Sequence, residues 1–237
     1  MKKSITVLCS NLKGNLGDFA IAEAIAVAAQ RYLGACSINL YYHANKPVDS
    51  SRLAALLAET SLEFKQIKPA PYYRRPIWLR WLNRLGISNG AYNKWHNRQI
   101  ERVAALIQAD EDFFKTAMSS DLVIFAGGAQ WGRGDLNLNM FAQLRAVGSR
   151  RKGVYAFPFS VSEATEICNG RLGVKQLFSS LCQPIYVRDG ISYACLQASG
   201  VEAELVCDSV FSLLHAFQVS WSLDALGDAC SDRVYVS

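Results

Sequence analysis

Four short clusters of glycine and polar residues each follow an apolar segment of the sequence. They are Asn15-Leu16-Gly17-Asp18, Gly127-Gly128-Ala129-Gln130, Arg188-Asp189-Gly190-Ile191-Ser192 and Asp208-Ser209. Glycine lets the backbone approach a ligand closely, and arginine presents a planar, permanently charged donor to anions. Amide and carboxylate groups hydrogen-bond to hydroxyls. These residue types could therefore bind a small molecule that carries negative charge or many hydroxyls.

The first cluster lies between a predicted strand, residues 5–9, and a predicted helix, residues 19–33. Gly14 and Gly17 accept a positive φ, and Asp18 is a suitable N-cap. A helix N-terminus presents free N–H groups and a partial positive charge, which favours an anion or a sugar there. A turn that only joins a strand to a helix uses the same residue types, so this cluster alone leaves both interpretations open.

The elements between the clusters explain how the clusters could meet. The predicted strands cover residues 5–9, 37–42, 62–67, 122–126, 153–157, 185–187 and 203–207. The predicted helices cover residues 19–33, 50–59, 93–108, 140–147, 172–181 and 191–198, the last closed by Gly200. This alternation predicts an α/β fold with a doubly wound parallel, Rossmann-like sheet. Ligands bind beyond the carboxyl ends of such strands, where all four clusters fall.

Composition excludes several other classes of protein. The 237 residues are 51% hydrophobic and 19% charged, as in a globular domain. No apolar run reaches the ~18 residues of a membrane span, and Asn11 and Lys13 interrupt the amino-terminal apolar segment before it resembles a signal peptide. The seven cysteines occur singly and the three histidines are far apart. We therefore expect buried thiols in a reducing cytosol and no metal site.

The formal net charge of +5 is unevenly distributed along the chain. Basic and aromatic residues alternate within residues 72–98, and residues 77–85 have the pattern of a short amphipathic helix. This mixture is typical of nucleic-acid surfaces and of helices at membrane headgroups. Because of this amphipathic pattern we expect peripheral contact with the inner membrane face, and because no nucleic-acid motif is present we expect no nucleic-acid partner. A solvated cationic surface with buried tryptophans is the alternative.

The order of the clusters resembles that of the polysaccharide pyruvyl transferase family. The matching residues are Asn15, Gly17, Asp18, Ala20 and Ile21; Asp121, Val123, Ile124, Gly127 and Gly128; Tyr155, Ala156 and Pro158; Arg188, Asp189, Ser192 and Leu196; and Asp208 and Phe211. The resemblance runs from residue 4 to residue 214. The chain departs from the family where Ala-Gly-Gly-Ala replaces a run that often has three glycines, and where Ser209 replaces a usual proline.

The resemblance implies the amino-terminal half of a GT-B-like two-domain architecture. Residues 1–215 would form the Rossmann-like domain, 216–231 a linker, and 232–237 the start of a truncated second domain. A terminal edge strand of the same sheet is the alternative for the last segment. The implied reaction transfers pyruvate from phosphoenolpyruvate to two sugar hydroxyls as a ketal in surface or exopolysaccharide biosynthesis. The resemblance thus implies phosphoenolpyruvate as the donor substrate and no cofactor. The implied acceptor is a saccharide, which in such pathways is often lipid-linked, and the implied location is the cytoplasm.

The substrate-binding residues expected from the clusters and the resemblance are Asn15, Gly17, Asp18, Gly127, Gly128, Gln130, Arg188, Asp189, Ser192 and Asp208. Arg188 and the helix amides after Gly17 would stabilise anionic groups, while Asn15, Asp18 and Gln130 would hydrogen-bond to hydroxyls. Because Asp18 would repel a phosphate, the first turn is expected on the acceptor side. No general acid or base is assigned. Family members carry donor-associated Arg and His residues in the second domain, so a chain of this length alone is expected to bind ligand poorly and not turn over.

Other interpretations stay open. A GT-B glycosyltransferase that uses a nucleotide sugar would share the fold, but the first turn reads Gly-Asn-Leu-Gly and not Gly-x-Gly-x-x-Gly, and the second strand is not followed by a suitable acidic residue. A non-catalytic domain of a carbohydrate pathway is the third possibility. At the residue level, Arg188 and Asp189 could form a local ion pair, Asp189 and Ser192 could simply start a helix, and Asp208 could be a turn residue.

Overall fold

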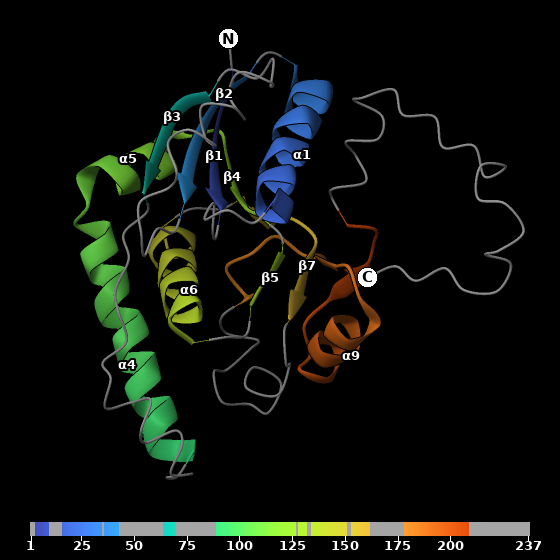
Figure 1. The fold of residues 1–237 in the computed structure, drawn as a ribbon. Helices are drawn as coiled ribbons and strands as arrows, with labels where there is room; N and C mark the ends of the chain where they lie inside the picture. The colour runs from blue at the N-terminus through green and yellow to red at the C-terminus, as the bar shows by residue number, and fades with distance from the viewer. Residues whose placement is uncertain are drawn as a thin grey trace, which may run out of the picture.

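The computed structural model describes residues 3–9, 16–34, 36–42, 64–69, 89–126, 128–131, 134–150, 153–161 and 178–208. Its strands are β1 (Lys3–Cys9), β2 (Cys36–Tyr42), β3 (Phe64–Pro69), β4 (Leu122–Phe125), β5 (Gly128–Trp131), β6 (Val154–Ala156), β7 (Phe159–Val161), β8 (Ile185–Val187) and β9 (Ala203–Leu205). Its helices are α1 (Leu16–Leu33), α4 (Asn89–Gln108), α5 (Glu111–Ser119), α6 (Gly134–Gly148) and α9 (Gly190–Ala198), as Figure 1 shows.

The described strands form two parallel sheets. The first has the order β3-β2-β1-β4-β6 and the second the order β5-β7-β8-β9. All the strand pairs are parallel, which confirms the predicted α/β class. From β1 the chain proceeds to β2 and β3 on one side and later crosses to β4 and β6 on the other. This reversal creates a topological switch point between β1 and β4.

The two sheets follow one another along the chain. Only two residues separate β4 from β5, and two separate β6 from β7. The N–H of Ala126 donates to the carbonyl of Leu8, and the N–H of Phe157 donates to the carbonyl of Phe125, both at 2.8 Å. The hydrogen-bond ladder of the first sheet thus continues past its strands. The second sheet extends in the direction of the carboxyl ends of the first (Figure 1).

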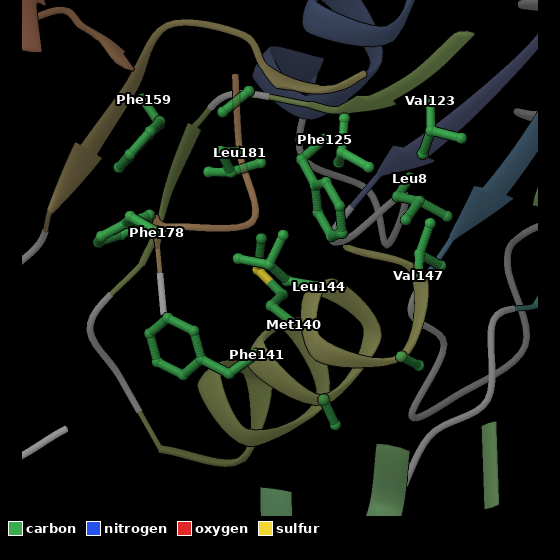
Figure 2. Packing of buried hydrophobic residues seen from close by; sticks show 14 of the residues in the cluster. Leu8, Val123, Phe125, Met140, Phe141, Leu144, Val147, Phe159, Phe178 and Leu181 are labelled. Atoms are coloured by element: carbon green, nitrogen blue, oxygen red, sulfur yellow. The ribbon is translucent and has the colours of Figure 1, made fainter. Parts of the chain in front are cut away.

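At β1, β2 and β4 the first sheet is buried on both faces, because the residues of these strands divide between two apolar clusters. Ile5 and Val7 of β1 share a cluster with Ile25 of α1. Leu8 of β1 belongs to the other cluster, which includes residues of α4, α5 and α6. Figure 2 shows Met140, Phe141, Leu144 and Val147 of α6 together with Leu8, Phe125 and Phe159 in this second cluster. Apolar side chains on both faces are what a sheet covered by helices on both sides requires.

Helix α1 begins earlier than expected. It starts at Leu16, so Gly17 and Asp18 are its second and third residues. The expectation that Asp18 is the N-cap is therefore wrong.

The sequence pattern does not predict three of the described elements, namely α5, β5 and β7. Helix α5 is capped by Asp110, whose Oδ1 accepts a hydrogen bond from the N–H of Phe113 at 3.1 Å. The sequence also predicts no strand at the positions of β5 and β7, and Gly128 and Gln130 lie on β5. Several predicted segments lie outside the described residues. They are the helix at 50–59, most of the helix at 172–181, residues 72–88 of the basic-aromatic segment, the linker at 216–231 and the second-domain start at 232–237.

The cysteines differ from expectation in part. Cys36 is buried, whereas Cys207 is a free thiol that is exposed, and Cys195 is disulfide-bonded. The expectation of buried thiols throughout is therefore wrong for the last two. In the described ranges, no cluster of three or more His, Cys, Asp or Glu side chains could hold a metal ion. None of the helices described has both the length and the apolar character needed to cross a bilayer.

The close approach of the end of α6 to Ser180 gives the first prediction. A Cβ added at Gly148 would lie under 3.0 Å from the Cβ of Ser180, which real Cβ atoms do not tolerate. We expect Gly148→Ala to lower the free energy of unfolding by about 1–3 kcal/mol, measured by urea denaturation.

Gly190→Ala is the matched control, since a Cβ there has no atom within 4 Å. It should change the unfolding free energy by less than about 0.5 kcal/mol. Adding Ser180→Gly to Gly148→Ala should restore much of the loss. Equal stability of the Gly148 and Gly190 variants would show that α6 does not pack against Ser180 in this way.

Candidate functional site

The structure separates the predicted site residues into two groups. The first group follows β1 and β4: Gly17 and Asp18 lie in the first turn of α1, and Gly128 and Gln130 lie on β5. Asn15 and Gly127 belong to the same segments but lie outside the described residues. The second group follows β8 and β9 and consists of Arg188, Asp189, Ser192 and Asp208.

The first group lies at the topological switch point. β1 and β4 are neighbours, and Leu8 pairs with Phe125 near their carboxyl ends. The start of α1 and the start of β5 therefore follow adjacent strand ends, and α1 contacts β5. In open α/β sheets this is the position at which a crevice for ligands forms.

The strand register relates the two groups. Gly128 of β5 pairs with Phe159 of β7, and Phe159 pairs with Val187 of β8. Gly128 and Val187 thus lie at the same level two strands apart, which corresponds to about 10 Å. Arg188 is one residue farther along. Two small molecules bound side by side could therefore contact the first and the second group at the same time.

Arg188 is held by two polar side chains. Its Nε donates to the Oγ of Ser160 at 2.8 Å, and its Nη1 forms an ion pair with the Oδ2 of Asp208. The side chains of Arg188 and Asp208 are 25% and 19% exposed. The ion pair that Arg188 forms is thus with Asp208, and not with Asp189, which was the local alternative that the sequence left open. Within the described residues, Nη2 of Arg188 makes no hydrogen bond.

Asp189 starts the next helix. Its Oδ1 accepts a hydrogen bond from the N–H of Ser192, and its Oδ2 accepts one from the hydroxyl of Ser192, both at 2.8 Å. The Oγ of Ser192, which is fully buried, accepts a hydrogen bond from the N–H of Val161 at 2.8 Å. These bonds join β8, α9 and β7. Asp189 and Ser192 thus have the structural role that the sequence left open for them, and Gly200, with φ +70°, follows the helix as predicted.

The electrostatic environment keeps Asp189 ionised. Burial acts to raise the pKa of this carboxyl, but the Ser160 hydroxyl, the backbone N–H and hydroxyl of Ser192, and the positive charge of Arg188 outweigh it. The pKa of Asp189 is therefore lowered below its ordinary value of 3.8. A carboxyl that is ionised well below neutral pH cannot serve as a general acid at pH 7. Its role here is to accept hydrogen bonds.

Ser160 is the member of this network that sequence reasoning missed. It lies on β7, which was not expected to be a strand, between the buried residues Phe159 and Val161. Its only sequence signal is its place two residues after Pro158, which belongs to the pattern shared with the family. Placing it beside Arg188 requires the pairing of β7 with β8.

The lowered pKa of Asp189 makes stability depend on pH. A carboxyl with a lower pKa in the folded than in the unfolded state stabilises the fold above the unfolded value, and this contribution is lost as the pH falls through the folded value. We expect Asp189→Asn to lower the unfolding free energy by about 1–2 kcal/mol at pH 7. The difference from wild type should shrink as the pH falls below 3.8.

Asp110→Asn provides the control for capping alone. Asp110 caps α5 through one backbone hydrogen bond, and Asn is as good an N-cap as Asp. Its variant should differ little from wild type in urea denaturation at pH 7. If both Asn variants lose the same stability at every pH, the charge of Asp189 contributes nothing beyond capping.

Comparison with known proteins identifies the family of the chain. No curated protein matches the sequence. Residues 15–233, however, match the family described as polysaccharide pyruvyl transferase, and this range contains both groups of site residues. It covers most of the 237 residues. The chain therefore belongs to the polysaccharide pyruvyl transferase family.

Proposed function

We propose that this protein transfers pyruvate from phosphoenolpyruvate to two hydroxyls of a saccharide, as a cyclic ketal, in surface or exopolysaccharide biosynthesis. Family membership indicates a transferase with a saccharide acceptor. The observation that carries the choice of donor is Arg188, a partly exposed guanidinium whose Nη2 has no hydrogen bond to a described residue. A planar cation of this kind suits a carboxylate or a phosphate.

The proposed reaction defines what the site must supply. A proton is added to the methylene carbon of the donor, which becomes a methyl group. The oxygens of two sugar hydroxyls form bonds to the neighbouring carbon, and the bond from that carbon to the phosphate oxygen breaks, which releases inorganic phosphate. Of the two protons that the hydroxyls lose, one balances the proton added to the methylene carbon and the other ends on the released phosphate. The donor carries a phosphate and a carboxylate, so cations and N–H groups are needed to stabilise it. General acid and base groups must handle the protons.

The two groups of residues suit the two substrates. In this proposal the first group, with Asn15, Asp18 and Gln130, hydrogen-bonds to the hydroxyls of the acceptor, because a carboxylate in the first turn of α1 repels a phosphate. Arg188 binds the anionic donor, with Asp208 beside it. The separation of about 10 Å between Gly128 and the residue before Arg188 leaves room for a sugar ring next to a small anion. Asp189 and Ser192 support Arg188 through the start of α9.

Ligand-induced stabilisation tests the donor. We expect millimolar phosphoenolpyruvate to raise the melting temperature of the full chain, because a ligand that binds only the folded state stabilises it. Arg188→Gln should weaken this effect by about tenfold in ligand concentration, since it removes a charged donor. A thermal-shift titration with phosphoenolpyruvate, a nucleotide sugar and an oligosaccharide measures it.

Arg145→Gln is the matched control, because Arg145 also forms an ion pair, with Glu101 at 2.9 Å, but on the surface between α6 and α4. Its titration should match that of the wild-type protein. Stabilisation by the nucleotide sugar alone would instead favour a glycosyltransferase. Stabilisation by the oligosaccharide alone would favour a non-catalytic carbohydrate-binding domain.

We also propose peripheral membrane contact through residues 72–98. Residues 89–98 belong to α4, which buries Ile100 and Val103 against the core and exposes Arg98 and Arg102. Residues four positions apart share one face of a helix, so these two arginines lie on the same exposed face of α4 at the end of the basic segment. Basic residues near an anionic membrane contribute attraction that salt screens.

Vesicle binding tests this contact. We expect the wild-type chain to co-sediment with anionic vesicles at low salt, and Trp78→Ala combined with Trp81→Ala to reduce the bound fraction several-fold, because tryptophan side chains insert at the headgroup level. Tyr32→Ala is the control, since Tyr32 is an aromatic residue of α1 that is 77% exposed. Equal binding of the double variant and the wild type would remove these tryptophans from any membrane role.

A further inference from the structure

Ser160 joins the two charged groups that follow β8. Its Oγ accepts a hydrogen bond from Nε of Arg188 at 2.8 Å, and its hydroxyl is one of the groups that lower the pKa of the Asp189 carboxyl. A serine hydroxyl has one proton to donate and two lone pairs that accept, so it can accept from Arg188 and still present its proton to a carboxylate. Ser160 therefore links the guanidinium of Arg188 to the electrostatics of Asp189.

The orientation of the Ser160 hydroxyl follows from the charges on its two sides. Because Arg188 donates to Oγ, the Ser160 proton points away from the guanidinium, and the ionised Asp189 carboxylate, whose pKa this hydroxyl lowers, can only accept. Asp189 is itself held by Ser192, whose hydroxyl is anchored to the N–H of Val161. The orientation of the Ser160 hydroxyl is thus set by bonds that reach back to its own strand.

The backbone around Ser160 is firmly placed. Phe159 is fully buried and Val161 is 3% exposed, and Phe159 pairs with Val187 of β8. Ser160 therefore lies beside Arg188 as a consequence of strand pairing. A hydroxyl on such a strand is a more rigid partner than one on a loop or on a long side chain.

The guanidinium of Arg188 is consequently held at two nitrogens. Ser160 holds Nε and Asp208 holds Nη1, which fixes the plane of the group and leaves Nη2 as the nitrogen without a described partner. An arginine without such partners must be ordered when an anion binds, at a cost in side-chain entropy. Here the ordering precedes binding.

We propose that Ser160 is a positioning residue that orients Arg188 so that Nη2 faces the anionic donor. This inference rests on the proposed function, because it assumes that Arg188 binds phosphoenolpyruvate. Ser160 itself does not contact the donor. Its loss should therefore weaken donor binding while the charge of Arg188 remains.

The experiment compares Ser160→Ala with Ser160→Thr, which keeps the hydroxyl on a residue that suits a strand. Ser119→Ala is the control, because the Ser119 hydroxyl donates to a backbone carbonyl of α5. Two quantities are measured on the full chain: the titration of the Asp189 carboxyl by NMR without ligand, and the dissociation constant for phosphoenolpyruvate by calorimetry.

In Ser160→Ala we expect the pKa of Asp189 to rise, because one of the hydrogen bonds that lowers it is lost. We expect the dissociation constant for phosphoenolpyruvate to rise by about tenfold. Ser160→Thr and Ser119→Ala should match the wild type in both quantities.

Two results would overturn the inference. One is that the pKa of Asp189 is the same in Ser160→Ala as in the wild type. The other is that the wild type binds phosphoenolpyruvate and Ser160→Ala binds it equally tightly. If the wild type binds no phosphoenolpyruvate, the proposed function and the positioning role both fail. A shifted Asp189 titration in Ser160→Ala would then show that the hydrogen bond exists, which separates failure of the function from failure of the geometry.

Discussion

The positions of the candidate binding groups depend on two backbone hydrogen bonds beyond the first sheet, from Ala126 to Leu8 and from Phe157 to Phe125. They hold the residues through which β4 leads into β5 and β6 into β7. Because β7 then pairs with β8, the same ladder fixes the level of Arg188. A slip of one residue would turn each side chain of the second sheet to its opposite face. The site is therefore a consequence of sheet register.

The charges after β8 and β9 are balanced by this arrangement. Arg188 forms an ion pair with Asp208, its positive charge helps to lower the pKa of Asp189, and the N-terminus of α9 adds partial positive charge. A partly buried guanidinium is costly without partners, so its pairing with Asp208 stabilises the apo fold. A guanidinium has five N–H donors, and two contacts do not exhaust them. An anion can bind at Nη2 while both protein contacts remain, which reconciles a paired arginine with a role in ligand binding.

The sequence predicted long or clearly bounded elements well. The predicted bounds of β8, residues 185–187, are the bounds in the structure, because an apolar segment lies between Pro184 and the charged Arg188. Strands β5 and β7 were missed because they have four and three residues and lie beside Gly127-Gly128 and Pro158, which are turn signals. Pairing with neighbouring strands overrides these local preferences. The residue types of the site could thus be predicted, but two of the strands that arrange them could not.

The partners of Arg188 show why local sequence is insufficient for the site. Asp189 is adjacent in sequence, yet its carboxylate caps α9, and the ion pair forms with a residue twenty positions later. Leu205 pairs with Val187, so Val206 lies at the level of Arg188. Asp208 is two residues beyond, the spacing that returns an extended chain to the same face. Phe159 pairs with Val187 on the other side, which brings Ser160 to Arg188. Both contacts follow from register across three strands, so the chemistry of this arginine becomes predictable only once the sheet is known.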